Sequence, residues 1–339
     1  MHPFINDWFV HLKQMRRRHP TVAICVPWKR IYEMVRHYDL PSLMIECDKV
    51  GGSIDYYGIE RIEDGIAYRL MGGKTPIKML YPVPSAHYHN LSAYNIEPTI
   101  VSLQCLESLV KAALATSTQT PLPVHLWINS GYRSVGIDSA TEFIACVNLI
   151  KRHSTIIKCQ AVGTKFPYEK GITTFSDLYK FTPKEVCALV RAPNSFHNRC
   201  MQTFNDIIAQ EKHAAPFTHF ATSFEVYANA VTSSTNFITV GNLFYYGFKP
   251  KVYSWPLELQ QIADLPMGQC LVNDCAPHVL KRPIHAATLF SRIPTQHIYA
   301  GSNKPPLEIL DEDLNHGKVV VSLKQKQIPR TFIARRKFF

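Results

Sequence analysis

Short apolar segments alternate with helical patterns through the first two thirds of this chain, and that alternation constrains its fold most strongly. The apolar segments are rich in β-branched residues and bounded by proline or glycine, which is typical of buried strands. They cover residues 21–26, 53–59, 76–83, 123–131 and 157–167, with a further short strand near residue 96. Strands that alternate with helices predict βα units and a parallel sheet. Because the pattern continues over about 240 residues, it favours a closed (β/α) barrel over an open sheet.

Helical spacing occupies the intervals between these strands. It predicts helices over residues 29–38, 60–73, 103–114, 139–152 and 182–190. The last of these begins with Thr182 and has Glu185 three residues later, a capping-box sequence. From Gly247 the pattern changes to short extended runs separated by prolines, which predicts a small all-β domain. We therefore expect an α/β chain, with a barrel over residues 1–246 and a C-terminal β domain over residues 247–339.

Composition places the chain among globular cytoplasmic proteins. Its apolar runs are too short to span a bilayer, and its first residues lack the order of a signal peptide, so we expect no membrane contact. The net charge is +11, but the basic clusters are short and terminal and no nucleic-acid motif accompanies them, so no nucleic-acid partner is expected. The nine cysteines are scattered without metal-ligand spacing, which indicates buried thiols in a reducing compartment and no metal site.

Three segments, taken in order, resemble the alanine racemase family. The stretch "VHLWINSGYRSVGI" from Val124 is similar to the family's "VHLKIDTGMNRLGI". Upstream, "DYYGIERIEDGIAYRLMGGKTPIKML" resembles "DGFAVATLEEALELREAGITAPILVL", and downstream "THFATSFEVY" and "TVGNLFYYG" resemble "HLANSAALL" and "VRPGIALYG". The resemblance covers roughly residues 10–250 and fades beyond. It implies a barrel of the type that binds pyridoxal 5'-phosphate (PLP), followed by a β domain.

The resemblance implies a lysine at the end of the first barrel strand that forms a Schiff base with PLP. The matching run here is "AICVPWKRIYEM". A strict alignment puts Val26 or Pro27 at the lysine's place, whereas Lys29 reaches it if the strand end holds a short insertion. Lys29 is therefore the candidate catalytic and cofactor-binding residue, and Tyr32 is the candidate for the family tyrosine that contacts the phosphate. The competing interpretation is that Lys29 is a solvated lysine at a helix start.

Other positions depart from the family pattern. Trp127 replaces the lysine of "HLKID", and Val240 replaces the arginine that holds the pyridine nitrogen. The tyrosine that acts as the second acid/base has no counterpart at its place, which falls at "SRIPTQHIY"; Tyr299 comes several residues late. These changes predict that efficient two-base racemisation is lost.

The phosphate end of the family's site is better preserved. Ser223 matches the serine of "HLANS", whose hydroxyl donates to the phosphate, and Asn242 and Leu243 match the loop whose amides cap it. Backbone amides bind phosphate whatever the side chain, so substitution is tolerable there. The competing interpretation of Ser223 is a helix-cap serine.

Three functions are open at this point. The first is a divergent PLP-dependent amino-acid racemase, acting on L- and D-alanine and forming a homodimer, as the resemblance implies. The second is a catalytically inactive relative that binds PLP or another ligand or has a regulatory role. The third is an unrelated barrel that binds an anionic ligand with its basic surface. A placed lysine–tyrosine pair favours the first, and its absence favours the second.

Overall fold

The computed structural model describes most of the chain. The described residues are 4–30, 32, 34–35, 38–51, 54–115, 120–131, 135–165, 180–192, 195–211, 214–249, 251–265, 267, 270–272, 277–279, 283–290, 297–299, 306–307, 309–313, 318–323 and 332–338. They form two compact units, one of residues 1–29 with 40–248 and one of residues 30–39 with 249–339.

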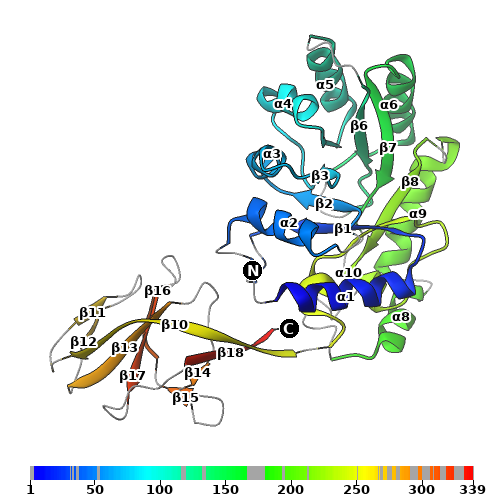
Figure 1. The fold of residues 1–339 in the computed structure, drawn as a ribbon. Helices are drawn as coiled ribbons and strands as arrows, with labels where there is room; N and C mark the ends of the chain where they lie inside the picture. The colour runs from blue at the N-terminus through cyan, green and yellow to red at the C-terminus, as the bar shows by residue number, and fades with distance from the viewer. Residues whose placement is uncertain are drawn as a thin grey trace. The chain divides into compact units, whose positions relative to one another are not determined.

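The first unit is built on a parallel sheet (Figure 1). Its strands are β1 (Ala23–Trp28), β2 (Tyr56–Ile59), β3 (Ile77–Met79), β4 (Ile96–Glu97), β5 (Thr99–Ile100), β6 (Leu122–Trp127), β7 (Ile157–Gly163), β8 (Phe217–Thr222) and β9 (Phe237–Thr239). The sheet order is β4-β3-β2-β1-β9-β8-β7-β6-β5. The two edge strands β4 and β5 are separated only by Pro98, whose carbonyl accepts from the His125 amide at 3.0 Å. One segment thus pairs with β3 on one side and β6 on the other, which closes the sheet into a barrel.

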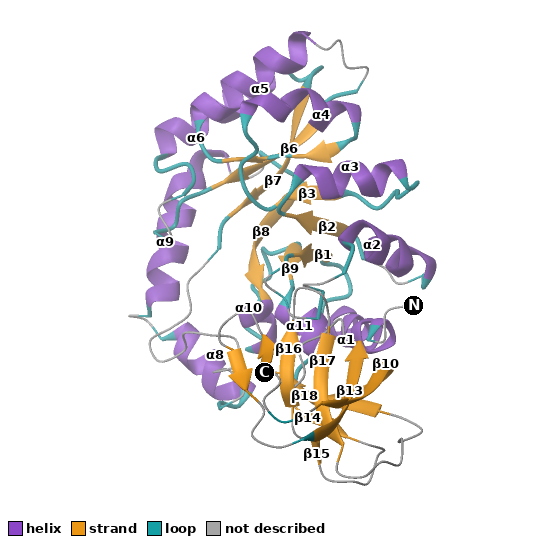
Figure 2. Ribbon diagram, turned by 90° about the vertical axis from the view of Figure 1, so that its left-hand side faces the viewer, coloured by secondary structure: helices purple, strands orange, loops and turns teal. Residues whose placement is uncertain are grey.

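Helices lie outside this ring of strands (Figure 2). They are α1 (Ile5–Arg18), α2 (Leu40–Lys49), α3 (Ile62–Leu70), α4 (Tyr88–Ala93), α5 (Leu103–Ala115), α6 (Ala140–Arg152), α8 (Pro183–Arg191), α9 (Phe196–Ile208), α10 (Ser223–Tyr227) and α11 (Asn242–Tyr246). Short 3-10 turns occur at Ser85–His87 and Ala209–Glu211. Each long helix buries one apolar stripe; α6, for example, buries Phe143, Cys146, Val147, Leu149 and Ile150. This pattern follows from the 3.6-residue helical period.

The predicted (β/α) barrel followed by a β domain is confirmed, with two local differences. Residues 29–38 were expected to be a helix, yet none of the described positions there is helical. Strand β1 also runs through Pro27 to Trp28 rather than ending at Val26. Pro27 is tolerated because its carbonyl still accepts a hydrogen bond, from the Tyr245 hydroxyl at 3.1 Å, while its missing N–H removes only one bond of the ladder.

The second unit is antiparallel. Its main sheet has the order β15-β14-β18-β10-β13-β17-β16, and β11 and β12 form a separate pair. The strands are β10 (Lys251–Leu265), β11 (Cys270–Val272), β12 (Pro277–Val279), β13 (Ile284–Phe290), β14 (His297–Tyr299), β15 (Pro306–Leu307), β16 (Ile309–Asp313), β17 (Lys318–Leu323) and β18 (Phe332–Phe338). The central β10 pairs with both β13 and β18, so it organises the sheet. Across both units, none of the described helices has the length and apolarity that a membrane crossing requires.

Candidate functional site

Lys29 lies at the carboxyl-terminal end of the barrel strands. It directly follows β1, and its ammonium is 3.2 Å from the Glu60 carboxylate, which directly follows β2. The Nζ also donates to the hydroxyl of Tyr81, two residues past β3, and lies 4.5 Å from that ring's centroid. Carboxyl ends of parallel strands are where barrel proteins place their sites. The structure therefore puts Lys29 at the expected end of the barrel, but with its amine engaged by Glu60 and Tyr81.

The two residues predicted for the phosphate end come together. Ser223 begins α10 after β8, and Leu243 lies in the first turn of α11 after β9. Both are buried, and the Leu243 amide donates to Ser223 Oγ at 3.3 Å. Asn242 is next to them at the start of α11 and is half-buried. A hydroxyl and a backbone amide at adjacent strand ends are donors suited to a phosphate oxygen.

An acidic side chain lies close to these donors. Glu225 closes a capping box on Thr222, whose amide and hydroxyl both donate to Glu225 Oε2, at 2.7 and 2.6 Å. The other oxygen, Oε1, is 3.7 Å from His197 Nδ1 of α9, and both side chains are buried. One oxygen of the Glu225 carboxylate thus binds the first turn of its own helix, and the other faces His197. The carboxylate opposes anion binding at Ser223 unless His197 offsets its charge.

Deeper in the barrel is a group of buried polar residues that sequence reasoning missed. We call it the barrel-interior cluster: Lys78 of β3, Glu97 of β4, His125 of β6, His219 of β8 and Thr239 of β9. Lys78 Nζ is 3.2 Å from His219 Nδ1, and His219 Nε2 is 2.7 Å from Thr239 Oγ1. His125 Nε2 is 2.6 Å from Glu97 Oε2. The signal in the sequence is a lysine between two apolar residues of the strand "PIKML", which alternation places on the inner face.

Burial dominates the electrostatics of this cluster. Desolvation lowers the pKa of Lys78 from 10.5 to about 8, although the Cys25 and Glu97 side chains oppose the shift. Burial, together with the charge of Lys78, also lowers the pKa of His125 and holds the pKa of His219 well below 6.5. A lysine ammonium can only donate, so it fixes His219 Nδ1 as acceptor and leaves the Nε2–H to donate to Thr239.

The pairing of neighbouring strands places Lys78 at the same height in the barrel as Pro27, near the carboxyl end of β1. Lys78 pairs with Gly58 of β2, and Gly58 pairs with Pro27 of β1. Gly58 has no side chain between them, and a Cβ there would lie 3.2 Å from Cys25 Sγ and 2.6 Å from a Leu80 methyl. The space beside Gly58 is therefore filled by the Cys25 and Leu80 side chains, and the Lys78 amine lies in the barrel interior against His219.

Trp127 covers this cluster from the carboxyl-terminal side. It is the last residue of β6 and is itself only partly buried. Its ring centroid is 5.2 Å from Lys78 Nζ and 5.7 Å from the His219 ring. The side chain at the position of the family lysine in "HLKID" therefore lies beside Lys78 and His219.

Tyr32 and Val240 have backbone partners of their own. Tyr32 belongs to the second unit, in a turn where its carbonyl accepts from the Val35 amide at 3.0 Å. Val240, in place of the pyridine-binding arginine, is fully buried, and its amide donates to the Cys25 carbonyl at 2.9 Å. Residues 132–134 and 291–296, which include the place matched to the second acid/base, lie outside the described residues.

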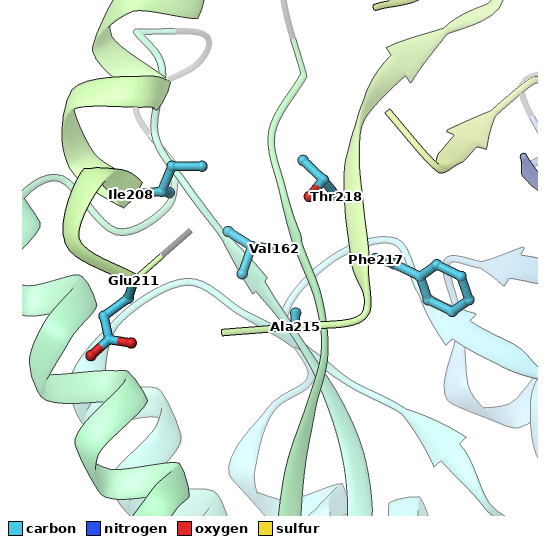
Figure 3. Close-up of a pocket in the computed structure, with 6 residues that line it drawn as sticks. All are labelled: Val162, Ile208, Glu211, Ala215, Phe217 and Thr218. Carbon is cyan, nitrogen blue, oxygen red and sulfur yellow. The ribbon is translucent and has the colours of Figure 1, made fainter. Parts of the chain in front are cut away.

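A small depression on the barrel's outer side is a weaker candidate. It lies between α9 with its following turn and the strands β7 and β8, and it encloses no space for a water molecule (Figure 3). Its lining is Val162, Ile208, Glu211, Ala215, Phe217 and Thr218. The charged group there, Glu211, is already paired with Lys151 at 3.0 Å. Within the described ranges, no three His, Cys, Asp or Glu side chains are grouped to hold a metal ion.

Comparison with known proteins gives consistent results. The family model "Alanine racemase, N-terminal domain" matches residues 14–249. The alanine racemase of Staphylococcus saprophyticus is 23% identical over 252 residues, covering 74% of this chain and 57% of that protein. Alanine racemase 2 of Clostridium acetobutylicum is 30% identical over 147 residues, covering 42% of this chain and 37% of that protein. The chain therefore spans less than two thirds of the length of these relatives.

Solved structures extend the likeness to 97% of the chain. An alanine racemase from E. faecalis has a TM-score of 0.69 at 17% identity, covering 97% of this chain and 86% of that one. A histidine racemase from Leuconostoc mesenteroides has a TM-score of 0.67 at 13% identity, covering 97% and 85%. At such identities the likeness concerns the fold. The family model covers well over half of the sequence, and this chain belongs to the alanine racemase family.

Proposed function

We propose that this chain binds pyridoxal 5'-phosphate at the carboxyl end of its barrel and does not racemise alanine efficiently. Family membership supports the cofactor, because the family uses PLP. PLP, when bound, supplies an aldehyde that lysines attack and a ring that draws electrons from a substrate amino acid. The substrate class that family membership favours is a small amino acid.

The convergence of Ser223 and Leu243 carries this proposal. The Leu243 amide now donates to Ser223 Oγ at 3.3 Å, a long hydrogen bond between two neutral groups. A phosphate oxygen would accept from both the amide and the hydroxyl, and charge-assisted bonds are roughly twice as strong as neutral ones. The residues at the phosphate end therefore fit the group that the resemblance implies.

The residues at the ring end fit less well. Val240 is apolar and buried where the family has a cation for the ring nitrogen. A PLP ring bound here would therefore differ from the family's in how strongly it withdraws electrons. Trp127 replaces a second family lysine, and its ring lies beside Lys78 and His219 of the barrel-interior cluster instead. These two differences support the loss or change of racemase activity, because both alter groups around the reacting centre.

Lys29 is the amine that the sequence resemblance favours for attack on the aldehyde. To attack an aldehyde it would first have to leave its ion pair with Glu60 and its hydrogen bond to Tyr81. The visible spectrum of the protein with PLP, beside a Lys29→Ala variant, tests this assignment. A lysine-bound cofactor band that disappears in the variant supports Lys29. A band unchanged in the variant removes it.

The binding proposal is tested by titrating the purified chain with PLP and following tryptophan fluorescence. We expect saturable binding that Ser223→Ala weakens by about 10- to 100-fold, the effect of losing about 1.5–3 kcal/mol of charge-assisted hydrogen bonding. An assay for D-alanine formation from L-alanine should show no turnover above a protein-free control. Absence of saturable binding would refute the proposed cofactor, and efficient turnover would refute the proposed loss of activity.

Family membership also suggests a homodimer, which we propose for this chain. Light scattering coupled to gel filtration would show twice the chain mass of 38.6 kDa. A monomer at all concentrations tested would contradict it.

A further inference from the structure

The surroundings of Lys78 differ from those of an ordinary lysine, which is exposed to solvent. Lys78 is 2% exposed, inside a barrel, and no carboxylate oxygen of the described residues forms an ion pair with its amine. Its nearest polar partner is a histidine nitrogen, at 3.2 Å, and aromatic rings of Trp127 and Phe237 face it at 5.2 and 5.7 Å. A structural lysine in a barrel interior usually needs a closer negative partner, since an isolated buried charge is costly.

The position of Lys78 along the barrel relates it to the proposed cofactor site. Its ladder partner Gly58 is in register with Pro27, a position that strict alignment gives to the family's lysine. Its amine crosses the interior and reaches His219 on β8. Ser223 follows His219 by four residues on the same side of the barrel, so at about 3.3 Å per residue the phosphate donors lie no more than about 13 Å further toward the carboxyl end.

We propose that Lys78, rather than Lys29, is the amine of this barrel that reacts with the aldehyde of pyridoxal phosphate. The proposal rests on the proposed function, because it takes the cofactor as the carbonyl compound. The lysine that bonds to the cofactor is then on the third strand, and the first strand has Pro27 at the same height in the barrel. Trp127 is the side chain that the cofactor's ring must displace to reach it.

The chemistry of such a step balances without another reactant. The lone pair of neutral Lys78 Nζ forms a bond to the aldehyde carbon, the carbon–oxygen double bond breaks, and the oxygen leaves as water with the two protons that the nitrogen loses. His219 Nδ1, which accepts from Nζ in the structure, is placed to take a proton from the nitrogen during attack. The neutral amine is accessible near neutral pH because burial lowers its pKa to about 8.

The groups that face Lys78 are consistent with a neutral amine. Glu97 of β4 and Cys25 of β1 favour its charged form, while burial works against it and has the larger effect. Burial raises the pKa of Cys25 to about 11, so the thiol stays protonated near neutral pH and offers no full negative charge. The net result is an amine that is partly deprotonated at pH values where exposed lysines are almost entirely charged.

The test is to incubate the full chain with less than one equivalent of PLP at about pH 7.5, reduce with borohydride, and map the modified lysine by peptide mass spectrometry. Borohydride supplies a hydride that makes the carbon–nitrogen bond permanent. We expect the label on Lys78 at 10-fold or greater excess over any other lysine. A label on Lys29 would overturn the proposal while leaving PLP binding intact. If the chain retains PLP but no lysine is labelled, the role of Lys78 is overturned and PLP binding stands. If the chain neither retains PLP nor carries a label, the proposed function is refuted as well.

Trp127→Ala provides a second measurement that does not depend on removing the reactive residue. Because Trp127 covers the cluster, its truncation should raise the rate of labelling at Lys78 several-fold and leave the rate at Lys29 unchanged. Lys78→Met serves as the matched control, since it keeps the length of the side chain and removes the amine. An unchanged rate at Lys78 in Trp127→Ala, in a chain whose circular dichroism matches the wild type, would contradict the proposed route.

Discussion

Replacing Lys78 by Met should change the way the barrel's stability depends on pH. In the folded chain the pKa of Lys78 is about 8, against 10.5 for an exposed lysine. At about 1.4 kcal/mol per pKa unit, this shift means that the charged lysine costs the folded state about 3 kcal/mol at neutral pH. The side chain is almost fully buried, so solvent screening does not reduce that figure greatly.

The sign of the effect follows from proton binding. Between pH 8 and 10.5 the unfolded chain keeps the Lys78 proton that the folded chain has released, so the unfolded state binds more protons. Stability therefore rises with pH across that window. Between pH 7 and 9.5 the wild type should gain about 2 kcal/mol from this group, and the Met variant should gain none of it. Both histidines of the cluster, with pKa values below 6.5, titrate outside that range. Cys25 acts within it in the opposite direction, because burial raises its pKa from 9.0 to about 11, but this contribution is present in both chains.

Urea unfolding at both pH values measures the difference. Of the four tryptophans, Trp8, Trp28 and Trp127 are in the barrel unit and Trp255 is in β10, so fluorescence reports mainly on the barrel. The quantity to compare is the free energy of unfolding of the wild type minus that of Lys78→Met, because other groups that titrate in both chains cancel. A difference that is the same at pH 7 and 9.5 within error would refute the lowered pKa, and with it the argument for a reactive amine.

One further variant and one matched pair of variants test other parts of the structure. Glu225→Gln keeps the capping-box hydrogen bonds but removes a buried negative charge near Ser223, so it should tighten PLP binding by about 10-fold in a fluorescence titration; unchanged or weaker binding would place the phosphate elsewhere. Gly136→Ala should destabilise the barrel by about 2–3 kcal/mol in urea unfolding, because φ is +128° and a Cβ would lie 2.6 Å from the Asn129 amide nitrogen. Gly131→Ala, at φ +95° with open space around it, should cost only about 1 kcal/mol, and equal costs would contradict the steric argument.

The sequence predicts the barrel well because strand and helix periodicities are local signals. The strands near residues 21, 53, 76, 123 and 157 are all present, and so is the capping box at Thr182 and Glu185. The expected helix over residues 29–38 was wrong, since its apolar spacing at Ile31, Met34 and Val35 does not become a helix at the described positions. Helix spacing in a short segment does not outweigh tertiary context.

The candidate site is predicted less completely, because it depends on which strands become neighbours. Ser223 and Leu243 were matched through the resemblance, and the structure brings them together. Lys78, Glu97 and His219 are far apart in sequence and gather only when the barrel closes. A single lysine in an apolar strand indicates an inward-facing charge, but nothing local to it identifies the histidine that meets it.

The most direct test of the proposed PLP site is equilibrium dialysis of the purified chain against PLP and against pyridoxal, which has the same ring and aldehyde but no phosphate. We predict that PLP binds at least about 100-fold more tightly than pyridoxal, because two charge-assisted hydrogen bonds at Ser223 and Leu243 contribute about 3 kcal/mol or more. Equal affinities, or no retention of either compound, would contradict a phosphate-binding site at these residues.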